Sequence, residues 1–125
     1  MSKGITITAY GQFGRPVGSD PTKVIPLTEP KIAVIGKKYN KSNAQIIIRW
    51  LIQRKIFAIP KTVHLDRLRE NFDVFDFELS EEDMKYMNDL NNNDRAFLHE
   101  FFCVGDQKWQ DVWDNEDCEW LRPEF

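Results

Sequence analysis

The chain has 125 residues, of which 42% are hydrophobic and 30% are charged, and its formal net charge is −3. This length and composition are typical of one small globular domain, and they exclude a disordered chain. No apolar run approaches the ~18 residues that a membrane span needs. The first ten residues also lack the basic and apolar regions of a secretory signal.

The small net charge conceals a strong asymmetry along the chain. Residues 1–72 hold 13 Lys and Arg against 4 Asp and Glu, a net charge of +9, whereas residues 73–125 hold 4 against 16, a net charge of −12. This asymmetry indicates either an anion-binding half followed by an acidic tail, or two sets of solvated helix faces. Composition alone leaves both interpretations open.

The first predicted element is a short strand over residues 4–10, where apolar and polar residues alternate at period two. Residues 11–28 follow with three glycines and three prolines, so we expect a long irregular loop. From Glu29 an apolar period of three to four residues predicts a helix, with Pro30 in its first turn. Asn40 and Lys41 end this helix.

A second helix is predicted to begin after Ser42, because Gln45 stands three residues on and completes a capping box. Its sequence, NAQIIIRWLIQR, is apolar almost all round, so we expect it to be buried on most sides. Residues 55–59 then predict a short apolar strand that Pro60 ends.

Two more helices are predicted. Residues 64–75 carry one apolar stripe, made of Leu65, Leu68, Phe72 and Phe75. Ser80 caps the last helix, whose apolar face is Met84, Met87 and Leu90. Beyond Leu90 no sustained period remains, and residues 106–119 are predicted to be a solvated acidic tail.

Cys103 and Cys118 stand 15 residues apart, without a CxxC pair and without a histidine at zinc-ligand spacing. We therefore expect free thiols in a reducing compartment, hence a cytoplasmic protein, and no metal site. His64 and His99 have no partner at catalytic spacing, so neither is assigned a general-base role. The basic residues are spread over several elements with few aromatics among them, which argues against nucleic-acid binding.

The order of the elements predicts an α/β fold. Strands separated by helices imply parallel pairing, since a parallel pair needs a long crossover connection. Two strands alone would leave two edges and two faces to cover. The pattern therefore indicates a piece of a larger α/β sheet.

The sharpest local motif is IPKTVHLDRLREN, residues 59–71. Lys61 and Thr62 follow a predicted strand and precede a predicted helix, where free backbone N–H groups and the helix dipole favour an anion. Lys61 adds a point charge, Thr62 a hydroxyl donor and Arg67 a planar fork suited to a phosphate. The alternative is an ordinary basic loop next to a solvated helix.

These residues carry a family resemblance. The segments SKGITITAYGQFG, LTEPKIAVIGKKYNKSNAQIIIRWLIQR and IPKTVHLDRLRENFDVFDFELSEEDM, with the closing PEF, resemble the C-terminal part of aldo-keto reductases. That family consists of NADP(H)-dependent (β/α)8 TIM-barrel enzymes. The resemblance implies that residues 1–125 are a partial barrel: its last two strands and helices, two extra helices and the C-terminal loop.

The resemblance also implies roles for individual residues. Tyr10 would stack on the nicotinamide ring, and the loop through Gly11 and Phe13 would cover the pyrophosphate. Lys61, Thr62 and Arg67 would hold the adenosine 2′-phosphate, and Glu70 and Asn71 the adenine. The predicted anion site and the family's 2′-phosphate site are thus made of the same residues.

No catalytic residue is predicted in this chain. Aldo-keto reductases use an Asp, a Tyr, a Lys and usually a His from earlier barrel strands, and a complete barrel needs ~250 residues. The complete protein is expected to reduce aldehydes or ketones with NADPH, whereas these 125 residues alone are expected to be inactive. The alternative is a truncated, non-catalytic nucleotide-binding or regulatory module.

Overall fold

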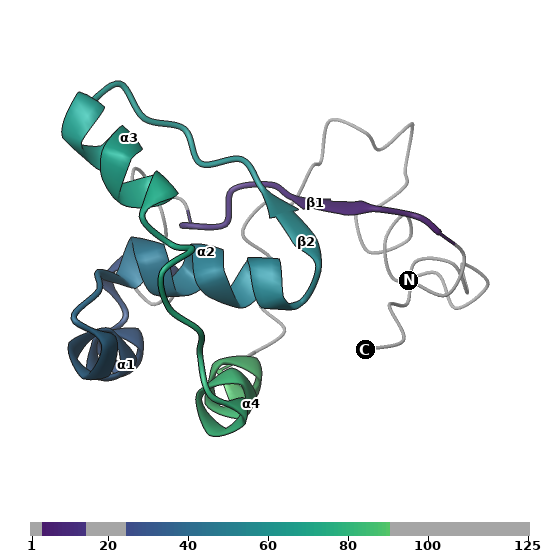
Figure 1. Cartoon of the computed structure of the whole chain (residues 1–125), viewed down its shortest axis with the longest axis vertical. Helices are drawn as coiled ribbons and strands as arrows, with labels where there is room; N and C mark the ends of the chain where they lie inside the picture. The colour runs from purple at the N-terminus through teal and green to yellow at the C-terminus, as the bar shows by residue number, and fades with distance from the viewer. Residues whose placement is uncertain (1–3, 15–24, 91–125) are drawn as a thin grey trace, which may run out of the picture. The chain divides into compact units, whose positions relative to one another are not determined.

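The computed structural model describes residues 4–14 and 25–90, which belong to one compact unit of the chain. Both cysteines, His99, the acidic stretch at 106–119 and the closing loop lie outside the described residues. The described elements are β1 (Ile7–Ala9), the 3-10 helix η1 (Pro26–Thr28), α1 (Pro30–Tyr39), α2 (Asn43–Gln53), β2 (Ile56–Ala58), α3 (Leu65–Phe72) and α4 (Glu81–Asp89) (Figure 1). None of the described helices combines the length and the apolar composition that crossing a membrane requires.

The two strands pair in parallel, as the sequence predicts, with Ile7 opposite Ile56 and Ala9 opposite Ala58. Each strand has only three residues, so both are shorter than expected. Phe57 and Ile59 are exposed although both are large and apolar. Within the described residues the sheet has two open edges, which agrees with the prediction of a piece of a larger α/β sheet.

Helix α2 lies at the centre of the described elements and packs against β2, α1, η1 and α3 (Figure 1). One buried cluster joins apolar residues of α1, α2, β2 and α4, namely Ile32, Ile35, Ile46, Ile47, Leu51, Ile56, Leu79 and Met87. The prediction that this helix is buried on most sides is confirmed. The capping box is also confirmed, with Gln45 N–H donating to Ser42 Oγ at 3.4 Å and Ser42 N–H donating to Gln45 Oε1 at 3.0 Å.

The helix predicted over residues 64–75 is shorter in the structure, and its apolar stripe faces outward. The helix ends at Phe72, and all four residues of the stripe are exposed. Val74 is buried instead, in the segment that leaves the helix. An apolar period shows which residues share a helix face, but it does not show whether another element covers that face. The irregular loop expected over 11–28 is corrected as well, because Pro26 starts the 3-10 helix η1.

Helix α4 begins at the predicted cap, where Ser80 Oγ accepts a hydrogen bond from Asp83 N–H at 3.2 Å. The Asp83 carboxylate is buried and accepts hydrogen bonds from Lys38 Nζ at 2.7 Å, Tyr39 OH at 2.5 Å and Ser80 Oγ at 2.8 Å. Burial alone would raise the pKa of Asp83, but these hydrogen bonds outweigh it and hold the pKa below its ordinary value. This network joins α4 to the end of α1.

The end of α1 explains a glycine inside a helix. Asn40 adopts a φ of 54°, which lets Lys41 N–H donate to the carbonyl of Gly36 at 2.9 Å. A Cβ on Gly36 would lie 2.5 Å from the carbonyl oxygen of Lys41. Gly36 is therefore required because the chain turns back across it, and this turn sets the position of Lys41.

We predict that Gly36→Ala destabilises the protein by about 1–3 kcal/mol, the usual cost of forcing extra volume into a packed position. Alanine is normally the better helix former by about 1 kcal/mol, so the expected sign is opposite to the helix-propensity effect. Urea unfolding measures the change. The control is Val34→Ala on the exposed face of the same helix, which should alter the unfolding free energy by less than about 0.5 kcal/mol.

Candidate anion-binding site

Two loops leave the same end of the sheet. Because β1 and β2 are parallel and Ala9 lies opposite Ala58, the loop that begins at Tyr10 and the one that leads to Lys61 start side by side. Loops at the carboxyl ends of parallel strands are where α/β proteins place their ligands. The fold therefore brings together two segments that stand 50 residues apart in the sequence.

The first loop is a tight turn that presents an aromatic ring. Tyr10 is 74% exposed, and Gly11 follows with a φ of 63°. Gly14 N–H donates to the carbonyl of Gly11 at 2.8 Å, and Phe13 packs against the buried cluster. Among the described residues, Gln12 Nε2 is a buried amide nitrogen without a hydrogen-bond partner. The loop thus presents an exposed ring, with a buried amide nitrogen close to it in the sequence.

The second loop joins β2 to α3 through a hydroxyl-stabilised turn. Thr62 Oγ1 accepts a hydrogen bond from His64 N–H at 3.1 Å, an arrangement typical of serine and threonine turns. Lys61 is exposed and makes no hydrogen bond or ion pair with another described residue. His64 caps α3 without a side-chain hydrogen bond. A cation and a hydroxyl therefore lie next to the positive end of a helix dipole.

Two arginines on α3 differ in their surroundings. Arg69 lies 3.9 Å from Asp66, between Nη1 and Oδ1. Arg67 is exposed and, within the described part of the chain, forms no hydrogen bond or ion pair. Its guanidinium is therefore available to a ligand. Arg67 lies on α3, the helix that follows the loop with Lys61.

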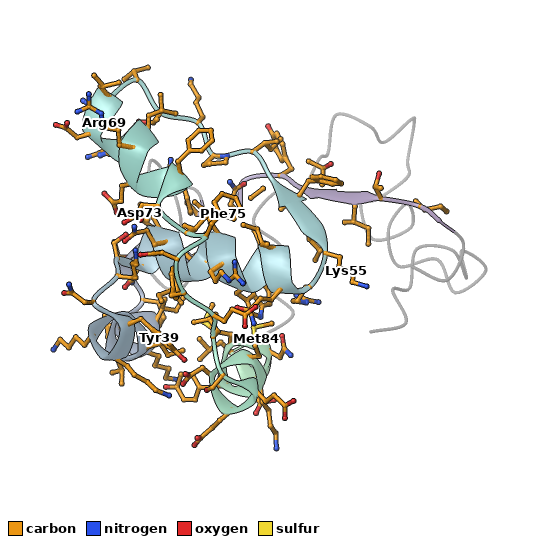
Figure 2. The ribbon with its side chains drawn as sticks, in the orientation of Figure 1. Tyr39, Lys55, Arg69, Asp73, Phe75 and Met84 are labelled. Carbon is orange, nitrogen blue, oxygen red and sulfur yellow. The ribbon has the colours of Figure 1, made fainter. Side chains whose placement is uncertain are left out.

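Three residues at the start of α2 hold the far end of α3. We call Lys41, Ser42 and Gln45 the α3 anchor. Gln45 is buried, and its Nε2 donates to the carbonyls of Glu70 at 3.2 Å and Asp73 at 2.9 Å. Ser42 Oγ donates to Glu70 Oε1. Figure 2 shows Asp73 where the chain leaves α3 beside this end of α2.

Lys41 completes the anchor with its charge. Its side chain is only 9% exposed, and its Nζ lies 2.9 Å from Asp73 Oδ2 and 2.9 Å from Asp76 Oδ1. Nζ also lies 5.1 Å from the centre of the Phe77 ring, within cation–π range. The hydrogen bond to Asp73 is the main cause that raises the pKa of Lys41, and the hydrogen bond from Lys41 lowers the pKa of Asp76.

Comparison with protein-family models matches residues 9–92 to the aldo/keto reductase family, a range that includes both loops and the α3 anchor. The chain belongs to the aldo/keto reductase family. It is similar to aldo-keto reductase family 1 member A1-A of Danio rerio, at 40% identity over 89% of this chain and 35% of the relative. For aldo-keto reductase family 1 member A1 the identity is 47% in Xenopus tropicalis, over 76% of this chain and 30% of the relative.

The human member A1 gives 41% identity over 78% of this chain and 31% of the relative. The chain thus spans about a third of the length of these curated relatives. The family match confirms the resemblance found in the sequence. Members of the aldo/keto reductase family are oxidoreductases. The family has a TIM-barrel fold, and the parallel strands and four α-helices of the described residues are consistent with part of one.

The structure places the residues that the aldo/keto reductase resemblance singles out in two groups. Tyr10, Gly11 and Phe13 lie in the first loop, and Lys61 and Thr62 in the second, at the same end of the sheet. The other three lie on α3, namely Arg67, Glu70 and Asn71. Within the described residues, no cluster of three or more His, Cys, Asp or Glu is placed to hold a metal ion.

Sequence reasoning missed the α3 anchor. It treated Lys41 as a helix breaker and Gln45 only as a capping residue. Their partners lie 25–35 residues further along the chain, so no local spacing reveals the contacts. The one available signal was the polar Gln45 in an otherwise apolar helix, because buried amides are normally hydrogen-bonded.

We predict that Lys41→Met loosens α3 and speeds amide hydrogen exchange at its C-terminal end severalfold, because both aspartates lose their cationic partner. Asp76 has a lowered pKa in the folded state, so its contribution to stability is present above its ordinary value of 3.8 and is lost as the pH falls below it. The difference in Tm between wild type and Lys41→Met should therefore shrink from pH 7 to pH 2.

Lys37→Met is the matched control, since Lys37 lies in the last turn of α1 and makes no ion pair with a described residue. It removes the same charge four residues away and should leave α3 exchange unchanged. Equal effects of the two variants would show that net charge, not the anchor, controls α3.

Proposed function

We propose that this chain forms the NADP(H)-binding part of an aldo/keto reductase. In this proposal Lys61, Thr62 and Arg67 hold the 2′-phosphate of the cofactor, and Glu70 and Asn71 contact its adenine. The observation that carries the proposal is that Lys61 and Arg67 are exposed cations without partners among the described residues, one before α3 and the other in its first turn. The less exposed Lys41 and Arg49 instead pair with acidic groups, Lys41 with Asp73 and Asp76 and Arg49 with Glu78.

The donors at this junction fit a phosphate. A phosphate oxygen accepts hydrogen bonds from ammonium, guanidinium, hydroxyl and backbone N–H groups, and the start of α3 supplies all four kinds. Thr62 Oγ1 accepts a hydrogen bond from His64 N–H, so the hydroxyl proton of Thr62 points to another acceptor. Within this loop that acceptor is the His64 carbonyl, and the distance of 3.4 Å between the two oxygens is long for an O–H donor. A ligand oxygen would be the better acceptor.

The first loop suits the other end of the cofactor. In this proposal the exposed Tyr10 ring stacks on the nicotinamide, and Gly11 and Phe13 lie over the pyrophosphate. The family usually has Ser-Pro where this chain has Gly11 and Gln12. The positive φ of Gly11 is one that glycine adopts readily, and the Gln12 amide, which has no partner for its buried Nε2 among the described residues, is a donor that proline lacks.

Bound NADPH supplies a hydride, and the complete protein would use it to reduce aldehydes or ketones to alcohols. Hydride transfer also needs a proton donor held beside the carbonyl. The Asp, Tyr, Lys and His that serve this purpose in aldo/keto reductases match no residue of this chain. We therefore propose that these 125 residues bind the cofactor without turning over substrate.

The 2′-phosphate proposal predicts that the chain binds 2′,5′-ADP more tightly than 5′-ADP. Arg67→Met should weaken 2′,5′-ADP binding about tenfold, the typical effect of losing one charge-assisted hydrogen bond, and should barely affect 5′-ADP. Isothermal titration at constant ionic strength measures both affinities. Arg69→Met is the matched control, because it removes an arginine that already faces Asp66.

Equal losses in the two variants would contradict a specific role for Arg67 and would indicate only general attraction of the anion to a basic helix.

Turnover is tested separately by following NADPH consumption with a generic aldehyde, beside a catalytically competent aldo/keto reductase as the positive control. We expect the purified chain to give the rate of the protein-free blank. A higher rate that depends on chain concentration would contradict the assignment of the catalytic groups to sequence outside these residues.

A further inference from the structure

Helix α3 depends on polar contacts for its position. None of its side chains is buried, so it contributes no residue to the buried cluster. Its C-terminal end is instead bound by Gln45, which donates to the carbonyls of Glu70 and Asp73. The backbone at Glu70 is thus fixed relative to α2, whose start carries Ser42.

Ser42 acts on the side chain of the same glutamate. Its hydroxyl oxygen accepts from Gln45 N–H, and its proton goes to Glu70 Oε1. Glu70 Oε2 has no hydrogen-bond partner within the described part of the chain. One carboxylate oxygen is therefore held and the other is free to accept.

We propose that Ser42 is a positioning residue that orients Glu70 so that Oε2 accepts a hydrogen bond from the exocyclic amine of the cofactor's adenine. This inference rests on the proposed function, which places the adenine beside Glu70 and Asn71. Ser42 itself does not touch the cofactor. It restricts the Glu70 carboxylate to one orientation before the cofactor binds. Without Ser42, the glutamate side chain would lose conformational entropy when it adopts this orientation on binding.

The chemistry of the carboxylate makes the base preference measurable. An ionised carboxylate only accepts hydrogen bonds, so an oriented Oε2 attracts an amino group and repels a carbonyl at the same position of the base. Hypoxanthine carries a carbonyl where adenine carries its amine. NADP+ and nicotinamide hypoxanthine dinucleotide phosphate share the 2′-phosphate and the nicotinamide, so their affinity ratio reports on the base alone. Hypoxanthine also carries a proton on N1, so the share of the ratio due to Glu70 is the part that the Glu70 variant removes.

The experiment measures the dissociation constants of both dinucleotides by isothermal titration with the whole chain. Wild type should prefer NADP+. Ser42→Ala should reduce this preference about two- to tenfold, the range expected when one flexible side chain loses its preorganisation. Ser42→Thr keeps the hydroxyl and should keep the preference, whereas Glu70→Gln should abolish it.

Two further variants separate orientation from folding. Ser42→Gly removes the hydroxyl at almost no cost to helix capping, so it should lower the preference while the circular dichroism spectrum stays that of wild type. Ser80→Ala removes the equivalent cap from α4, away from α3, and should leave the preference unchanged.

A preference that survives both Ser42→Ala and Ser42→Gly overturns the inference. It is also overturned if wild type binds the two dinucleotides equally, and continued discrimination of 2′,5′-ADP from 5′-ADP would then show that the proposed function itself holds. If wild type binds neither dinucleotide, both the proposed function and the inference fail.

Discussion

The candidate site depends on the hydrogen bonds and the ion pair that join the start of α2 to the end of α3. A helix with no buried side chain has little apolar packing to set its position, so hydrogen bonds and ion pairs contribute more. Gln45 supplies the buried contacts, and Lys41 adds its charge from the turn before α2. These contacts set the position of α3 and therefore of Arg67 and Glu70.

The same constraint extends back into α1. Lys41 reaches its two aspartates because the chain turns tightly after Asn40, and that turn leaves room only for a glycine at position 36. The side chain of Gln45 serves twice, in the capping box of α2 and in the anchor. A substitution at Gly36 would therefore affect the position of α3 without touching it.

The charge asymmetry of the chain now has a structural meaning. Basic residues of α1, α2 and their connection pair with acids from the second part of the sequence: Lys38 with Asp83, Lys41 with Asp73, and Arg49 with Glu78 at 3.1 Å. Part of the asymmetry is thus internal pairing between elements of the described residues. Lys61 and Arg67 make no such pair within the described residues, which supports their proposed role with an anionic ligand.

The sequence by itself determined the order of the two strands and the four α-helices, the parallel pairing of the strands, both serine caps and the family, because these follow from local periods and short motifs. It also named the cations at the start of α3. Only the tertiary structure decided that the stripe from Leu65 to Phe72 is exposed, and that Ser42 and Gln45 hold Glu70. Those contacts join residues more than 20 positions apart, and a local pattern shows which side chains share a face but not what meets that face.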